Sequence, residues 1–155
     1  MSDFWFSFIP EDPRYVLSTS AINKIKKFSW YEDNVTIIVN DTVKFANAGS
    51  NFERVSCPFC KSDLMSWWGG AMNEAHSEDA GFIKLDVVTP CCKKNTTLHS
   101  FDYYSSQGFY TTIIEMSPYF HQGTIRVPQG IHKDVIRQDL FEITDVKWRV
   151  IYTII

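Results

Sequence analysis

The sequence predicts an α+β domain, and two observations carry that prediction. A strand–helix–strand pattern occupies each end of the chain, whereas the middle section holds all four cysteines. The chain has 155 residues, of which 45% are hydrophobic and 21% charged, as in an ordinary globular domain. A chain of this length buries about two-thirds of its unfolded surface, so it needs no disulfide merely to fold. We therefore expect a single domain over residues 1–155 that carries one insertion.

The first third of the chain predicts a strand, a helix and a hairpin. Residues 3–9 are rich in aromatic side chains and read as a strand that Pro10 ends. A helix is expected over residues 19–30, because serine and threonine precede apolar residues at helical spacing. The β-branched run at 35–39 predicts the next strand, with residues 42–46 as its hairpin partner across a two-residue turn.

The last third repeats this order of elements. Residues 108–116 predict a strand, residues 132–143 show the apolar spacing of a helix, and residues 146–154 predict a closing strand. Two strand–helix–strand halves favour a split β-α-β, or ferredoxin-like, sheet with two helices on one face.

The middle section, residues 47–104, is predicted to be an inserted zinc-ribbon-like subdomain. It holds a glycine-interrupted helix over 62–76, a strand over 82–88 and an extended segment over 96–104. Because the first cysteine pair precedes this helix and the second follows the strand at 82–88, we expect the whole segment to be organised around one metal ion.

Charge and composition limit the compartment and the partners. Fifteen Lys and Arg against eighteen Asp and Glu give a net charge of −3, which offers no bulk attraction to nucleic acid or to anionic lipid. The first residues lack a basic and apolar leader, and no window approaches the roughly 18 apolar residues of a membrane helix. We expect a cytoplasmic protein without a membrane partner, whose thiols stay reduced.

The four cysteines predict a metal site. Cys57 and Cys60 have the spacing of a zinc knuckle, in which a tight turn aims two thiolates at one ion. Cys91 and Cys92 follow Pro90 and supply the second pair, so that four thiolates complete a closed tetrahedral site for structural Zn²⁺. Neighbouring side chains of an extended chain point to opposite faces, so a bend at Pro90 must reorient one of the adjacent pair.

Two alternatives stay open for these thiols. In the first, only three cysteines bind the metal and His99 or His76 completes the site. In the second, the cysteines are free core thiols or a redox pair.

The cysteine motifs also carry a resemblance. The stretch from Asn51 to Cys60, the pair Trp67-Trp68 and the stretch from Leu85 to Cys92 resemble bacterial zinc-ribbon-like proteins of unassigned function, with a CPxC…PCC pattern. Gly108-Phe109 belongs to the same set of motifs, and the opening Phe8-Ile-Pro-Glu-Asp-Pro with the β-rich C-terminal end extends the likeness loosely over most of the chain. Members usually carry glycine after the double cysteine, where this chain has Lys93. The resemblance implies zinc at Cys57, Cys60, Cys91 and Cys92, and it implies no reaction.

The sequence gives little support for an enzyme. Catalytic zinc keeps an open position for water, and four cysteine ligands leave none. No nucleophile elbow, phosphate loop or dinucleotide fingerprint is present, so no catalytic residue is assigned. A zinc-dependent hydrolase would require one cysteine to be displaced, with Glu74, His76 or His99 beside the open position.

A nucleic-acid-binding or regulatory zinc ribbon is the alternative function. Lys61, Lys93 and Lys94 flank the cysteines and would form a small basic rim. The negative net charge and the acidic residues of the same insertion argue against it, because lysines beside four thiolates also serve to offset their charge.

We therefore expect a non-enzymatic protein-interaction module whose partner is another protein. Trp67 and Trp68 are adjacent on the predicted helix, where successive positions lie about 100° apart, so both cannot face one core. An exposed tryptophan favours a partner surface, although packing of the insertion onto the sheet could bury both side chains. A small acidic bacterial protein without a catalytic constellation is also consistent with a toxin-neutralising immunity protein.

Overall fold

The fold is a mixture of strands and helices in a computed structural model, described for residues 3–117, 119–121, 124–126 and 133–155. The strands are β1 (Phe4–Pro10), β2 (Val35–Ala46), β3 (Arg54–Ser56), β4 (His76–Ser77), β5 (Gly81–Phe82), β6 (Asp86–Val88), β7 (Asn95–Thr97), β8 (Asp102–Tyr104), β9 (Gly108–Met116), β10 (Tyr119–His121), β11 (Thr124–Arg126) and β12 (Trp148–Ile154). The helices are α1 (Thr19–Ile25), α2 (Met65–Ala75) and α3 (Lys133–Thr144), with a 3-10 turn, η1, at Leu98–Ser100. The predicted α+β class is confirmed. None of the described helices combines the length and the apolar character that crossing a membrane requires.

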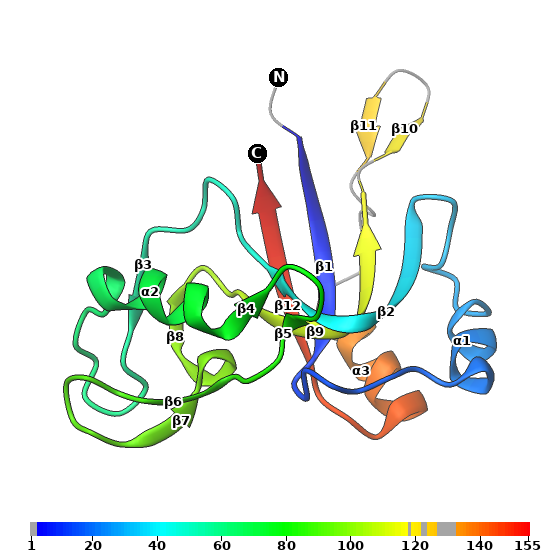
Figure 1. Cartoon of the computed structure of the whole chain (residues 1–155). Helices are drawn as coiled ribbons and strands as arrows, with labels where there is room; N and C mark the ends of the chain where they lie inside the picture. The colour runs from blue at the N-terminus through cyan, green and yellow to red at the C-terminus, as the bar shows by residue number, and fades with distance from the viewer. Residues whose placement is uncertain (1–2, 118, 122–123, 127–132) are drawn as a thin grey trace.

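The main sheet interleaves the two ends of the chain. Its strand order is β12-β1-β9-β2-β5-β4 (Figure 1). β1 runs antiparallel to β12 from Phe4 opposite Ile154 to Pro10 opposite Trp148, and β9 runs antiparallel to both β1 and β2. Since α1 joins β1 to β2 and α3 joins β9 to β12, each strand–helix–strand half supplies one central strand and one strand that flanks it.

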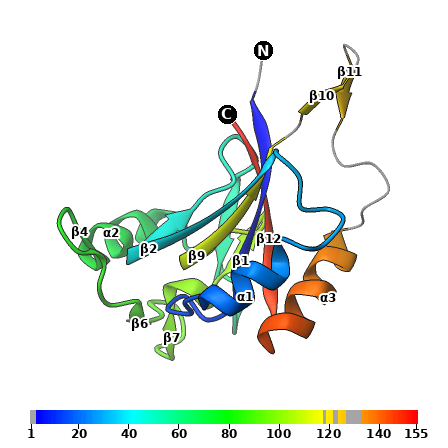
Figure 2. The same cartoon turned by 90° about the vertical axis from the view of Figure 1, so that its right-hand side faces the viewer.

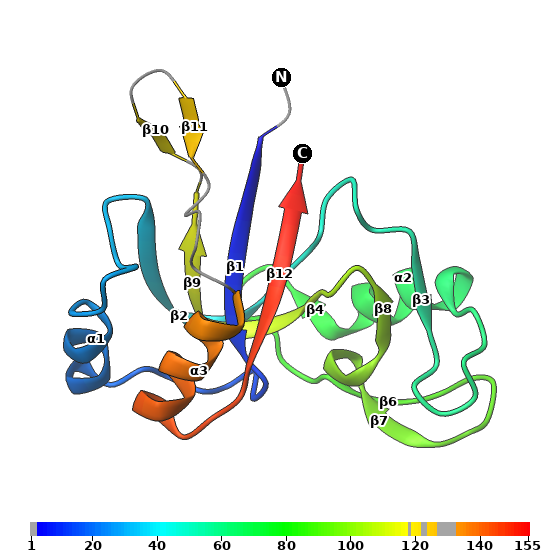
Figure 3. The same cartoon turned by 180° about the vertical axis from the view of Figure 1, so that it is seen from behind.

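Helices α1 and α3 cover the same face of these four strands and contact each other (Figures 2 and 3). Helix α1 begins where the side chain of Ser18 accepts a hydrogen bond of 3.1 Å from the backbone N–H of Ala21. The core beneath the helices is formed by buried side chains from both helices and all four strands, among them Phe8, Ala21, Ile25, Val35, Ile114, Met116, Ile136, Leu140 and Trp148.

Helix α1 is shorter than its sequence pattern predicts, because it ends at Ile25 and residues 26–30 turn away. Trp30 is buried by this turn, and its indole Nε1 donates a hydrogen bond of 3.0 Å to Asp139 of α3. Its ring also stacks on Phe28, with ring centroids 5.5 Å apart. These tertiary contacts outweigh the local helical pattern.

The hairpin predicted between residues 35–39 and 42–46 is wrong, because β2 is one strand. Both halves pair with β9, from Val35 opposite Met116 to Ala46 opposite Gly108. The register shifts between Val39 and Lys44, and the side chain of Asn40 donates a hydrogen bond of 3.2 Å to the carbonyl of Thr111. The polar residues that suggested a turn therefore form an irregularity within a continuing strand.

Residues 47–107, here called the insertion lobe, lie between β2 and β9 and contain α2 with two small sheets, β3-β8 and β6-β7 (Figure 1). The strand predicted over 82–88 is interrupted between β5 and β6, and the extended segment over 96–104 is interrupted by η1. A second apolar core fills the lobe and also receives side chains from β2 and β9: Val43, Val55, Cys57, Leu64, Leu85, Leu98, Phe101, Tyr103 and Phe109.

Arg149 of β12 joins the insertion lobe to the main sheet. Its Nη1 donates to the backbone carbonyls of His99, at 3.1 Å, and Gln107, at 2.5 Å. Its Nε and Nη2 donate to the two carboxylate oxygens of Glu11, at 3.1 and 2.7 Å. Gly108 leaves room for this arrangement, since a Cβ at that position would lie 2.7 Å from Arg149 Nη1.

Candidate metal centre

The first cysteine pair lies on a turn that follows β3. The backbone N–H of Lys61 donates to the carbonyl of Cys57 at 3.0 Å, and the N–H of Cys57 donates to the carbonyl of Ser62 at 2.9 Å. Lys61 has a φ of 63°, the left-handed conformation that closes such a turn. The turn brings Cys57 and Cys60 to the same side of the chain, as the spacing predicts.

The second pair lies on a matching turn that follows β6. The N–H of Lys93 donates to the carbonyl of Thr89 at 2.9 Å, and the N–H of Thr89 donates to the carbonyl of Lys94 at 2.9 Å. Lys93 has a φ of 56°, so the lysine adopts the conformation in which glycine is the usual residue. The bend expected at Pro90 therefore exists as a repeat of the first turn.

The matching hydrogen bonds of the two turns show why the second pair consists of adjacent cysteines. Cys92 occupies the place of Cys60, whereas Thr89 occupies the place of Cys57. Cys91 takes the position that Phe59 holds in the first turn. The shared signal x-Pro-x-Cys-Lys is visible in the sequence, and aligning on it would have identified Thr89 as part of the site.

All four sulfur atoms lie within 4.8 Å of one another. The separation is 3.3 Å for Cys60 and Cys91, 3.7 Å for Cys57 and Cys92, and 3.9 Å for the adjacent Cys91 and Cys92. Four sulfur ligands about 2.3 Å from one Zn²⁺ would lie about 3.8 Å apart, whereas a disulfide requires about 2.05 Å. The four predicted residues thus lie close enough to bind one metal ion.

The cluster is buried on one side and open on the other. Cys57 is fully buried in the core of the lobe and Cys92 is half-buried, whereas Cys60 and Cys91 are exposed. The backbone N–H of Phe59 donates to the Cys57 sulfur at 3.4 Å, and the hydroxyl of Thr89 lies 3.2 Å from the Cys92 sulfur. In a metal site, such bonds to sulfur orient the ligands and offset their charge.

The surroundings of the thiols, contacts among them included, lower the pKa of Cys60 and raise that of Cys91. Hydrogen bonds to Ser62 lower the pKa of Cys60 to about 6. Desolvation of its sulfur, together with hydrogen bonds to Cys60, Cys57 and Cys92, raises the pKa of Cys91 to about 12. Ionising all four sulfurs would place like charges side by side, and a cation between them would offset that repulsion. The donor set and this electrostatic conflict both fit a thiolate-binding divalent ion.

The side chains considered as alternative ligands lie elsewhere. His99 is buried beside β9, where its Nδ1 accepts the N–H of Phe109 at 2.9 Å. His76 packs on Phe82 with ring centroids 4.9 Å apart. Among the described residues, the cluster contains no histidine or carboxylate.

Two of the three lysines near the cluster have intramolecular partners. Lys61 forms an exposed ion pair with Asp102 at 3.3 Å, and Lys94 Nζ lies 5.0 Å from the centre of the Phe59 ring. Phe59 itself is 46% exposed on the rim of the first turn. Two of the three lysines of the expected basic rim therefore already contact other residues of the lobe.

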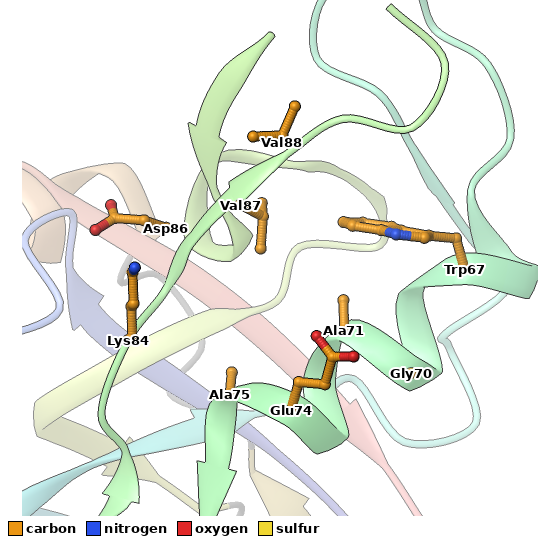
Figure 4. A pocket seen from close by; sticks show the side chains of 9 residues that line it. All are labelled: Trp67, Gly70, Ala71, Glu74, Ala75, Lys84, Asp86, Val87 and Val88. Atoms are coloured by element: carbon orange, nitrogen blue, oxygen red, sulfur yellow. The ribbon is translucent and has the colours of Figure 1, made fainter. Parts of the chain in front are cut away.

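The adjacent tryptophans of α2 differ in their surroundings. Trp68 faces the core, where its Nε1 donates to the Tyr103 hydroxyl at 3.1 Å and its ring packs on Phe45 and Phe52. Trp67 packs on Phe101 and also lines a groove between α2 and β6 (Figure 4). Both side chains are half-buried.

Comparison of the chain with protein families, with curated proteins and with solved structures finds no match in any of the three.

Proposed function

We propose that this chain is a non-enzymatic, zinc-stabilised protein-interaction module of a bacterium, related to the zinc-ribbon-like proteins with the CPxC…PCC pattern. The observation that carries the proposal is the convergence of four sulfurs within 4.8 Å from two matching turns. A closed set of four thiolates holds Zn²⁺ without an open position for water, which suits a structural and not a catalytic ion. The ligands are Cys57, Cys60, Cys91 and Cys92.

The scaffold of the module is proposed to be a ferredoxin-like split β-α-β sheet into which the zinc ribbon is inserted. The strand order β12-β1-β9-β2, antiparallel throughout, and the two helices on one face support this description. The small strands and short helix of the insertion lobe supply little regular structure of their own, so zinc would contribute much of the free energy that orders it.

A protein partner is favoured over a nucleic acid. Net charge is −3, Lys61 is paired with Asp102, and Lys94 lies over Phe59. A neutralising role toward a bacterial toxin, in the reducing cytoplasm that keeps the thiols available, is the specific form of the proposal. Trp67 is the tryptophan offered to the partner, since Trp68 is bonded to Tyr103 within the lobe.

The test combines metal analysis with a ligand substitution. Protein purified without chelator should contain one zinc with four sulfur neighbours at about 2.3 Å by X-ray absorption. Cys57→Ser should lose the ion and the near-ultraviolet circular dichroism of the nearby tryptophans, because the buried ligand anchors the first turn. Phe59→Ala, in the same turn but with an exposed side chain, should keep both signals.

Two outcomes would overturn the proposal. Retention of the metal and of the tryptophan signal by Cys57→Ser would remove the structural role of the cluster. Salt-dependent retention of the wild-type protein on a polyanion resin, abolished when Lys93 and Lys94 are replaced by Gln, would favour the nucleic-acid alternative.

A further inference from the structure

We propose that the groove between α2 and β6 binds an extended segment of the partner protein, with alternating aliphatic and basic side chains, as an added strand on β6. This inference rests on the proposed interaction function and specifies which surface performs it. The groove has a volume of about 510 Å³ (Figure 4).

One wall of the groove is a helix face made mostly of small residues. Trp67, Gly70, Ala71, Glu74 and Ala75 line it, at the spacing that brings residues to one side of an α-helix. The small side chains leave room beside the helix, and Trp67 closes one end with an aromatic surface (Figure 4).

Gly70 has no packing reason to be glycine. A Cβ there would meet nothing within 4 Å, and the same is true of Gly69. Glycine lowers the stability of a helix interior relative to alanine, so the structure alone gives no benefit from either residue. Only Gly70 lines the groove, where the missing side chain keeps the space open for an occupant.

The opposite wall is a strand with one free edge. β6 pairs only with β7 within the described part of the chain. The N–H of Leu98 donates to the carbonyl of Leu85, and the N–H of Thr89 donates to the carbonyl of Lys94. Because hydrogen-bonded pairs alternate along an antiparallel ladder, the N–H and C=O groups of Asp86 and Val88 point away from β7. Free groups in this arrangement are completed by an extended polypeptide.

The charges of the groove select the kind of segment. Glu74 on α2 and Asp86 on β6 are both exposed, and neither forms an ion pair or a side-chain hydrogen bond within the described residues. Lys84 lies on the same wall as Asp86, so the three charged residues that line the groove have a net charge of −1. Val87, Ala71 and Trp67 form the apolar part of the lining, with Trp67 on the side of Val87 away from Asp86 and Lys84 (Figure 4). A segment with aliphatic side chains flanked by Lys or Arg complements this lining.

The metal centre sets the width of the groove, since each wall is joined to one of the two metal-binding turns. β6 ends at Val88 and the second turn begins at Thr89, while α2 begins at Met65 shortly after the first turn ends at Ser62. Zinc would therefore fix the two walls relative to each other, and its removal would loosen the binding surface.

The experiment selects peptides from a phage-displayed random heptapeptide library on the zinc-loaded full-length protein. Enriched sequences, made as fluorescent synthetic peptides, are then measured by anisotropy. We expect alternating aliphatic and basic residues, and at least 10-fold weaker binding to Gly70→Leu than to the matched control Gly69→Leu. N-methylation of alternate peptide amides should weaken binding by a similar factor in one of the two registers, because it removes the donors to β6.

A second substitution keeps the test decisive if Gly70→Leu fails to fold. Asp86→Lys changes an exposed side chain without a partner in the described structure, and it should weaken a basic peptide at least 10-fold at low salt. The inference is overturned if no sequence is enriched, if Gly70→Leu or Asp86→Lys binds like the wild type, or if neither N-methylated register loses affinity. It is also overturned if sedimentation shows a dimer that Gly70→Leu dissociates, because the occupant would then be a second copy of the chain.

Failure of this inference differs from failure of the proposed function. If zinc and its four sulfur neighbours are found but no peptide binds the groove, only the groove assignment falls. If Cys57→Ser keeps its metal while Gly70→Leu still abolishes peptide binding, the groove stands and the structural role of zinc falls.

Discussion

Replacing Arg149 by Met is expected to destabilise the protein by about 2–7 kcal/mol. The carbonyls of His99 and Gln107 would lose their donor, and each buried acceptor left without a partner costs about 1–3 kcal/mol. The ion pair with Glu11 adds at most about 1 kcal/mol, because that carboxylate is 46% exposed. Met keeps the apolar part of the side chain, so the loss is mainly one of hydrogen bonds.

Urea unfolding at neutral pH, followed by tryptophan fluorescence, measures this effect. With an m-value of about 2 kcal/mol/M, the midpoint of Arg149→Met should fall by about 1–3.5 M. Glu11→Gln is the matched control, since it removes the ion pair but leaves both carbonyl bonds, and its midpoint should fall by no more than about 0.5 M. Equal midpoints for the two variants, or no change in Arg149→Met, would refute the role given to the carbonyl bonds.

Two further predictions concern His99 and Thr89. Burial, with the nearby Arg149, lowers the pKa of His99 from 6.5 to about 4, so its neutral form is favoured in the fold. The stabilisation that neutral His99 gives the fold is therefore complete above pH 6.5 and declines by up to about 3 kcal/mol as the pH falls toward 4. Over this range the urea midpoint of His99→Asn should fall less steeply than that of the wild type. An equally steep fall in the variant would contradict the assignment. Thr89→Val removes the hydroxyl that accepts from the Lys94 N–H and contacts the Cys92 sulfur, while keeping the side-chain shape. Zinc affinity in competition with a chromogenic chelator should fall about 10- to 100-fold, and an unchanged affinity would mean that the hydroxyl does not support the ligand.

Local patterns predict the outer elements of the fold well. The strand β9 occupies residues 108–116 as its sequence predicts, and α3 and β12 lie within two residues of their expected bounds. These segments combine a consistent apolar period with clear boundaries, so local and tertiary preferences agree. The pairing among strands far apart in the chain is not a local property, yet the two strand–helix–strand halves indicated a shared sheet.

The misread segments are those in which long-range pairing outweighs local chemistry. Asn40 and Asp41 resemble a hairpin turn, but Asn40 bonds to the carbonyl of Thr111 and the strand continues along β9. The continuous strand expected over 82–88 breaks because β5 pairs with β2 and β4 while β6 pairs with β7. A single sequence holds no signal for such a change of partner.

The cysteine cluster was predictable in its residues but not in the way the two turns build it. Cysteine spacing identified all four sulfurs that converge, whereas the part played by Thr89 emerges only from the matching hydrogen bonds of the two turns. The groove could be predicted even less from the sequence. The sequence predicted that Trp67 and Trp68 cannot both face one core but did not say which faces inward; the Tyr103 hydroxyl bond and the packing on Phe45 and Phe52 identify Trp68.

The unbroken course of β2 ties the folding of the lobe to that of the sheet. Val35, near one end of the strand, is buried beneath α1 and α3, and Val43, beyond the shift in register, is buried in the core of the lobe. β9, which runs in the opposite direction, also belongs to both cores, with Ile114 in the first and Phe109 in the second. Two strands shared in this way leave no flexible joint at which the halves could melt separately. Excising residues 47–107 would expose the apolar ends of β2 and β9 to water, so the loss of order in the lobe would weaken the sheet in the same event.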